Sequence, residues 1–394
     1  MIRFLLLIVL FIITQGFFDL VNNPLVLFSI EEQDAVLVFS ALVLLMQLFK
    51  IPFRKLGNYR IYLFLFFYCF ISNLVMGYLN IDQPLVFNLL TGRLYITYFF
   101  ILLALITLFN IADINLDRVN KFFVVISAFL ILLNIYVYFS QNYGIINGLV
   151  IVERFESARF LIGGLCVINL TIYFYENFFY SRINSLAFFG LLIVLFSVSK
   201  SRGIVNPILL IIMQDLFFNK NVLKGKILYK VTLSLFLAVF ILWNPSEIFN
   251  TVGNIVSLTH KEITENSGNF GFRVQEFSYY LGKLDLKSAV FGYGMENKKF
   301  SEILSYNNFF LSDLGLFRIF FTSGLIGLSI FIYSLYSLFK EARAGDTVLH
   351  KFVIGFVLFQ LFSFPTMTFF YYSGGVFIFL FIIVSLKQLN MSQQ

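Results

Sequence analysis

The chain has 394 residues, of which 59% are hydrophobic, 20% aromatic and only 12% charged. An ordinary soluble domain carries about 25% charged residues, so this composition excludes a water-soluble globule and indicates that lipid surrounds most of the chain. Two cysteines in apolar runs and two isolated histidines exclude a disulfide framework and give no metal-binding pattern, so neither a metal nor a cofactor is expected.

Charged residues divide the sequence into apolar stretches of the length that a membrane-spanning helix needs, roughly 20 residues. Twelve stretches predict an all-α polytopic membrane protein. In chain order they are Phe4–Phe18, Ile30–Phe49, Ile61–Asn80, Leu94–Phe109, Phe122–Phe139, Phe160–Tyr175, Ile183–Ser199, Ile204–Phe218, Val231–Trp243, Ile319–Phe339, Phe352–Phe369 and Gly374–Leu386. Pro365 and the Gly374-Gly375 pair break the last uncharged run, which predicts a tight helical hairpin.

The distribution of Lys and Arg predicts the orientation of these spans. Placing the N-terminus inside assigns 16 of the 28 basic residues and only six acidic residues to the cytoplasmic side, as the positive-inside rule requires. The net charge of +7 is therefore a topology signal, and nucleic acid is not an expected partner. An even number of spans places both termini in the cytoplasm, and the first span is expected to be an anchor rather than a cleaved signal peptide.

One long polar segment interrupts the pattern. Residues 1–243 contain spans one to nine, residues 244–317 form an extracytoplasmic loop, and residues 318–394 contain spans ten to twelve, all within a single integrated membrane domain. The loop contains turn signals at 266–268, at Gly271 and at Gly292-Tyr293-Gly294.

Several arginines lie on the predicted outer side, where positive charge is disfavoured. An arginine near a helix end in a bilayer is costly unless it faces a polar cavity, and its fork of donors suits phosphate. The alternative is that each one snorkels to lipid headgroups or pairs with a nearby carboxylate. The candidates for binding a phosphate group are Arg202, Arg273 and Arg318, followed by Arg93 and Arg159.

The ordered motifs of the outer side resemble a known family. Ser201-Arg202 in a sharp turn is followed by Arg273, by Gly292-Tyr293-Gly294, by Asn307-Asn308, and by Asp313, Gly315 and Arg318 before a helix that opens in Gly324-Leu325-Ile326-Gly327. This order is similar to that of the bacterial O-antigen and capsule polymerases (Wzy-type) and the related O-antigen ligases. The ligases and many polymerases carry a His-Asn pair where this chain has Asn307-Asn308.

The resemblance implies a GT-C-like fold in the bacterial inner membrane and a glycosyltransferase. Such an enzyme moves a growing glycan from undecaprenyl pyrophosphate to a lipid-linked repeat unit at the outer face, with inversion and without a metal. The arginines would bind the pyrophosphate, while Ser201, Tyr293, Asn307 and Asn308 would belong to the acceptor and structural motifs. Membrane lipid and a chain-length regulator protein are the other expected partners.

Deprotonation of the acceptor hydroxyl requires a base within hydrogen-bond reach. Asp313 and Glu276 lie nearest the motif residues and are the predicted catalytic carboxylates. If the stretch around Arg273 is helical, Glu276 shares its face. The structural alternatives are that Glu276 only orients Arg273 and that Asp313 caps the following helix.

Two other functions fit the same composition. An O-antigen ligase would move the glycan to a different acceptor, and the missing histidine disfavours it. A flippase or transporter of the lipid-linked unit would need charged residues along a path through the bilayer, whereas the basic residues of this chain concentrate at its two faces.

Overall fold

The computed structural model describes residues 2–14, 32–46, 53–112, 116–140, 164–178, 180–195, 268–296, 315–362 and 373–392. Within these ranges the chain is helical and contains no strand. The helices are α1 (Ile2–Thr14), α2 (Glu32–Leu45), the 3₁₀ helix η3 (Phe53–Tyr59), α3 (Arg60–Ile81), α4 (Leu85–Ala112), α5 (Leu116–Ser140), α6 (Gly164–Glu176), α7 (Arg182–Ile193), α11 (Gly268–Gly282), α12 (Leu286–Phe291), α14 (Leu316–Arg343), α15 (Val348–Phe362) and α16 (Ser373–Ser392).

The predicted all-α class is confirmed for the described part of the chain. Ten of the twelve predicted spans coincide with a helix, and the two predicted at 204–218 and 231–243 lie outside the described residues. The outer loop is not irregular throughout, because α11 and α12 form within it.

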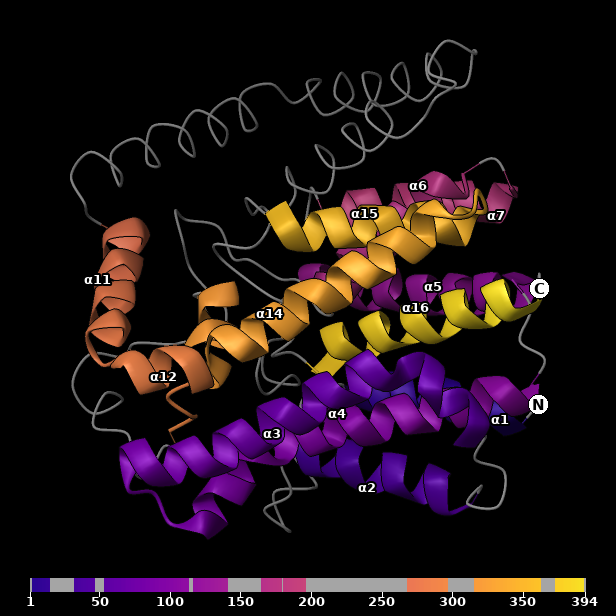
Figure 1. Ribbon diagram of the computed structural model, residues 1–394. Helices are drawn as coiled ribbons and strands as arrows, with labels where there is room; N and C mark the ends of the chain where they lie inside the picture. Colours follow the sequence, from indigo (N-terminus) through magenta and orange to yellow (C-terminus); the bar gives the residue numbers. More distant parts are fainter. Residues whose placement is uncertain are drawn as a thin grey trace.

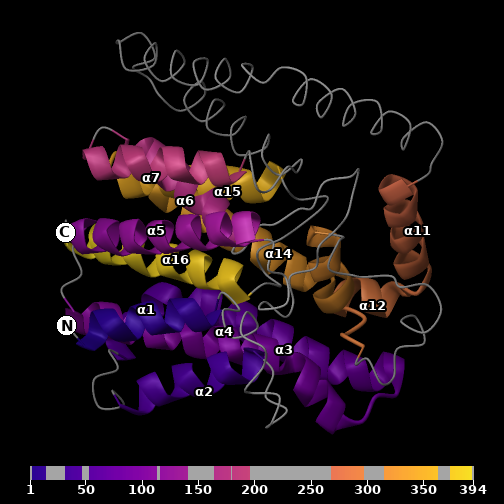
Figure 2. The ribbon, with the colours of Figure 1, turned by 180° about the vertical axis from the view of Figure 1, so that it is seen from behind.

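Most of the helices run side by side along one axis (Figure 1). The beginning of α1 and the end of α16 lie together at one end of this bundle, here called the terminal end, in both views (Figures 1 and 2). At the opposite end, here called the distal end, α3 ends and α4 and α14 begin. Helix α11 differs from the others because it runs across the bundle at the distal end.

Three of the described helical segments are long and apolar enough to cross a membrane: Leu56–Ile81, Leu85–Phe109 and Leu316–Arg343. At 1.5 Å per residue each one matches a hydrocarbon layer of about 30 Å. Large apolar side chains such as Phe64, Phe67 and Leu132 face outward from the bundle, as lipid contact requires. The chain is therefore a membrane protein by the length and composition of these helices.

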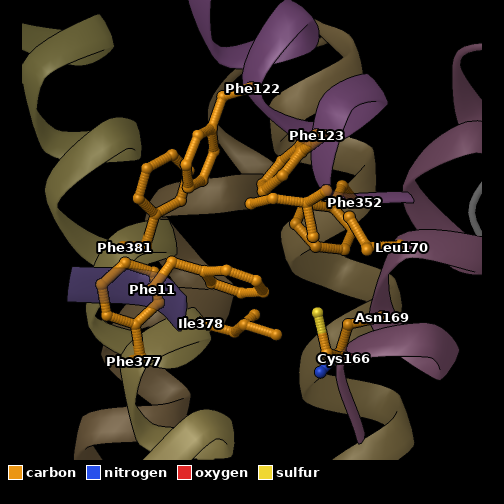
Figure 3. Close-up of a pocket in the computed structure, with 11 residues that line it drawn as sticks. Phe11, Phe122, Phe123, Cys166, Asn169, Leu170, Phe352, Phe377, Ile378 and Phe381 are labelled. Carbon is orange, nitrogen blue, oxygen red and sulfur yellow. The ribbon is translucent and has the colours of Figure 1, made fainter. Parts of the chain in front are cut away.

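Aromatic side chains fill the centre of the bundle. Figure 3 shows a small cavity there, where phenylalanines from α1, α5, α15 and α16 meet Cys166 and Asn169 of α6. Phe122 and Phe381 stack with their ring centroids 5.3 Å apart. The cavity lining carries no charged side chain and none of the predicted site residues, so this cavity belongs to the packing of the bundle.

Candidate functional site at the distal end

Helix α14 is broken one third of the way along its length. Gly324 has φ 68° and ψ −174°, which is far from helical, and a break of this kind leaves backbone carbonyls without their usual intrahelical donors. The Gly292-Tyr293-Gly294 loop supplies donors at this point. The N–H of Tyr293 donates to the carbonyl oxygen of Phe321 at 2.7 Å, and that of Gly294 donates to Thr322 at 3.3 Å.

The glycines are required by this close approach. Gly292, Gly294 and Gly324 all have positive φ, a region that side chains disfavour. A Cβ at Gly292 would collide with the backbone of Thr322, and a Cβ at Gly324 would collide with the backbone of Val290. The loop and the broken helix thus interlock through their main chains.

Polar side chains of α3 hold the other side of the loop. The amide oxygen of Asn73 accepts a hydrogen bond of 2.6 Å from the N–H of Met295. The amide nitrogen of Asn80 donates to the carbonyl oxygens of Gly292 at 3.4 Å and Tyr293 at 3.2 Å. Helix α3 therefore fixes the position of Tyr293 relative to α14.

A group of aromatic and charged side chains surrounds this loop. We call it the distal cluster, and it consists of Glu276, Tyr279, Tyr280 and Lys283 from α11 and its end, Tyr293 and Glu296 from the loop, and Phe317, Arg318 and Phe321 from the first turns of α14. Tyr280 and Phe321 are buried, and their ring centroids lie 4.8 Å apart. The ring of Tyr293 lies 5.0 Å from that of Phe321.

Lys283 links three members of the distal cluster. Its Nζ lies 3.2 Å from Oε1 of Glu296, and 5.1 Å and 5.6 Å from the ring centroids of Tyr279 and Tyr293. Partial burial acts to lower the pKa of Lys283, but the hydrogen bond to Tyr279 and the carboxylate of Glu296 outweigh it, so that its pKa is raised. The ammonium group therefore stays charged and joins the two tyrosine faces.

The hydroxyl of Tyr280 is subject to the electrostatic influence of a predicted catalytic residue, Glu276, and a predicted phosphate-binding residue, Arg318. Burial raises its pKa, the carboxylates of Glu296 and Glu276 raise it further, and the guanidinium of Arg318 opposes them. All three charged groups thus lie within electrostatic range of one hydroxyl. Glu276 is fully buried, whereas Arg318 is half-buried in the first turn of α14.

The structure brings together three of the residues predicted from sequence: Glu276, Tyr293 and Arg318. The conditional prediction of a helix around Arg273 is confirmed by α11, although the side chain of Arg273 lies outside the described part. Six further predicted residues also lie outside it: Asp313, Arg159, Arg202, Ser201, Asn307 and Asn308.

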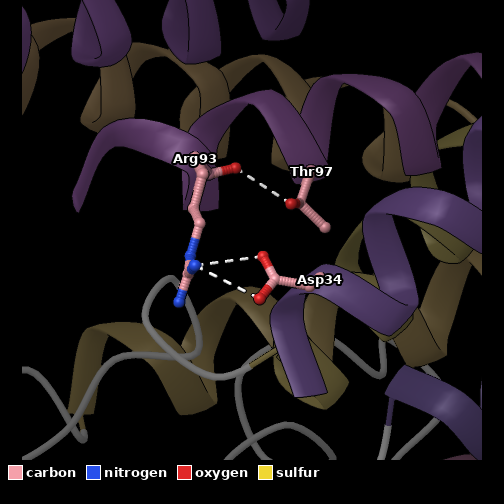
Figure 4. Close-up of polar contacts among 3 residues, drawn as sticks. All are labelled: Asp34, Arg93 and Thr97. Carbon is pink, nitrogen blue, oxygen red and sulfur yellow. Dashed lines mark hydrogen bonds and ion pairs between the residues drawn. The ribbon is translucent and has the colours of Figure 1, made fainter. Parts of the chain in front are cut away.

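Arg93 has a carboxylate partner on another helix. It lies on α4, and its Nη1 is 3.0 Å from Oδ1 and 3.2 Å from Oδ2 of Asp34 on α2 (Figure 4). This ion pair corresponds to the structural alternative weighed for the outer arginines. A phosphate would have to compete with Asp34 for the same guanidinium.

Sequence reasoning did not identify Lys283, Glu296, Asn73 or Asn80. The two asparagines did carry a signal, because they lie seven residues apart with Gly77 between them, on one face of an otherwise apolar helix. Polar residues in such a helix need partners. Lys283 closely follows Phe277, Tyr279 and Tyr280 in the sequence, but only the fold brings Tyr293 to it.

In chemical terms, the distal cluster combines a guanidinium, an ammonium, two carboxylates and aromatic rings, three of which are partly exposed. A guanidinium binds phosphate oxygens through paired donors, and a carboxylate can accept a proton. Among the described residues no group of three His, Cys, Asp or Glu side chains could hold a metal ion.

Comparison with models of protein families and with curated proteins finds no match for this chain.

Proposed function

We propose that this protein polymerises the lipid-linked repeat units of a surface polysaccharide at the outer face of the inner membrane. The observation that carries the proposal is the distal cluster at one end of an apolar helical bundle. In it, the buried Glu276 of α11 and Arg318 of α14 belong to two helices that pack on each other through Tyr280 and Phe321. A polyprenyl-pyrophosphate-linked glycan needs such a combination, because its tail lies in lipid and its diphosphate lies at the membrane surface.

Arg318 would stabilise the leaving group. The acceptor hydroxyl oxygen attacks the anomeric carbon, the bond from that carbon to the pyrophosphate oxygen breaks, and the pyrophosphate departs with both electrons of the bond. The transition state has oxocarbenium character, as in other reactions at anomeric centres. Negative charge grows on the pyrophosphate, where a positioned guanidinium lowers the barrier.

Glu276 is the candidate base within the described chain, and it would accept the proton of the acceptor hydroxyl. Because Glu276 has no exposed surface, a hydroxyl reaches it only when the groups that cover it move aside. Tyr279 and Tyr293, joined through Lys283, would offer ring faces to the sugar.

The same proposal includes the membrane topology, with twelve membrane spans, a GT-C-like arrangement and cytoplasmic termini.

The test is complementation of a strain that lacks this chain, with the surface glycan separated on a gel. We expect the deletion strain to accumulate single lipid-linked units and the wild-type chain to restore a ladder of polymer. Arg318→Ala should lower polymer formation on the order of 10²- to 10³-fold, as loss of one such donor does elsewhere. Arg318→Lys should retain part of the activity, because it keeps the charge but not the fork.

Arg343 provides the matched control. It is the other arginine of α14, is exposed at the terminal end and packs on the ring of Phe339, so Arg343→Ala should leave the ladder intact. An unchanged ladder with Arg318→Ala would contradict the proposal. Lipid-linked polymer that never reaches the surface would indicate a ligase, and single units trapped inside would indicate a flippase.

A further inference from the structure

From Val274 to its end, helix α11 presents three different strips. Its buried strip carries Glu276 and Tyr280 and faces the start of α14. A second strip is apolar and partly exposed, with Val274 at 36%, Phe277 at 41% and Leu281 at 47% exposure, although the ring of Phe277 also packs on that of Phe317 of α14. These three residues are spaced by three and four positions, so they form one line on the helix surface.

The third strip is exposed and polar or small. It consists of Gln275, Ser278 and Gly282. At about 100° per residue, this strip lies beside the apolar one. The exposed surface of α11 is therefore divided lengthwise into an apolar half and a polar half, a division that suits a boundary between lipid and water.

The direction of α11 agrees with such a boundary. In Figures 1 and 2 it runs across the distal end of the bundle, whereas the three helices long enough to cross a membrane run along the bundle axis. A helix that crosses the ends of membrane-spanning helices lies parallel to the bilayer plane at the depth of the interface.

Neighbouring elements also expose apolar side chains. On α12, Leu286 is 85% exposed and Phe291 is 47% exposed. Helix α12 packs on α3, where Tyr78 and Leu79 face outward. Exposed apolar side chains therefore occur on α11, on α12 and on α3, a helix that could span the membrane.

From these observations we infer that α11 is an interfacial helix whose Val274, Phe277 and Leu281 strip is immersed in the outer leaflet of the bilayer. Its occupant is lipid: the apolar strip contacts the acyl chains, while Gln275 and Ser278 face the water. The inference depends on insertion of the bundle in a bilayer but not on the reaction proposed above. It places the distal cluster at the depth of lipid phosphate groups.

A depth measurement tests this inference without any activity assay. Single cysteines at Leu281→Cys and Ser278→Cys, three residues apart on the exposed side of α11, are labelled with a nitrobenzoxadiazole probe. The protein is reconstituted in vesicles of phosphatidylethanolamine and phosphatidylglycerol that contain a 5-doxyl lipid. The native Cys69 and Cys166 are buried, so they label only if a variant fails to fold.

We expect the probe at position 281 to emit at a shorter wavelength and to be quenched by the doxyl lipid, and the probe at position 278 to be quenched by iodide in the water. Iodide quenching at both positions without lipid quenching would overturn the inference, because the strip would then face water. Protection of position 281 from both quenchers would also overturn it, because protein and not lipid would cover the strip. Loss of polymer formation has no bearing on either outcome.

Discussion

Asn73 of α3 accepts a 2.6 Å hydrogen bond from the backbone N–H of Met295, which lies 222 residues further along the chain. The same side chain donates to the hydroxyl of Thr91 at 3.1 Å and the carbonyl of Asn88 at 3.4 Å on α4. One asparagine therefore joins α3, α4 and the loop that carries Tyr293. Its exposed surface is zero, so water cannot replace these partners.

Replacing this asparagine should loosen the loop. We expect Asn73→Ala to lower the free energy of unfolding by about 1–3 kcal/mol, because the buried N–H of Met295 loses its acceptor. The measurement is thermal unfolding of the purified protein with a thiol-reactive dye, which reacts with the buried Cys69 and Cys166 only after unfolding. Val75→Ala, an exposed site on the same helix, is the control. If both variants unfold at the same temperature, Asn73 does not hold the loop.

The break in α14 gives a second prediction. Gly324→Ala places a side chain in a positive-φ conformation and against the backbone of Val290, so we expect a loss of roughly 1–3 kcal/mol from backbone strain alone. Gly282→Ala is the matched control, because nothing lies within 4 Å of a Cβ at that position. It should change stability by less than about 0.5 kcal/mol, as at other surface sites. Equal unfolding temperatures for the two variants would argue against the broken helix.

The ion pair between Arg93 and Asp34 can be measured by a double-mutant cycle. The single variants Asp34→Asn and Arg93→Gln each break the link between α2 and α4, so the double variant should lose less than their sum. Because both side chains are only partly buried, we expect a coupling energy of about 1 kcal/mol. A coupling of zero would show that the pair contributes nothing to stability.

The same variants separate a structural role of Arg93 from a role in binding. If Arg93 has only a structural role, Asp34→Asn and Arg93→Gln should lower polymer formation by similar amounts, because both variants lose the same contact. If Arg93 binds pyrophosphate, Arg93→Gln should lower polymer formation and Asp34→Asn should change it little. The gel assay described for Arg318 distinguishes these two outcomes.

Much of the helical framework could be predicted from the positions of charged residues. Arg60 precedes the apolar run of α3, and Lys340 and Arg343 end that of α14. A charge is costly inside a bilayer wherever the rest of the chain lies, so each boundary is a local property of the sequence. The bounds of α4 were less accurate, because the polar residues Asn88, Thr91 and Arg93 lie near its start. Their side chains find partners in Gln83, in Asn73 of α3 and in Asp34 of α2.

The candidate site could be predicted only in part. The Gly292-Tyr293-Gly294 motif indicated a special turn, and Arg318 and Glu276 stood out by their charge. The packing of Tyr280 on Phe321 and the role of Lys283 were not predictable, since these contacts join segments that no periodic pattern relates. The fold also distinguishes Tyr279, Tyr280 and Tyr293 from one another by burial and by ring contacts.

By itself the sequence determined that this chain is helical, apolar enough for lipid and divided at its charged residues, because the cost of placing a charge or an unpaired backbone group in lipid applies to each segment separately. Only the tertiary structure decided that α14 breaks at Gly324 and that the loop after α12 fills the break. Backbone groups released at Phe321 and Thr322 find their donors in a segment about 30 residues away, and the side chains that hold that segment come from α3. Those hydrogen bonds exist only once the helices have packed, so no local pattern could reveal them.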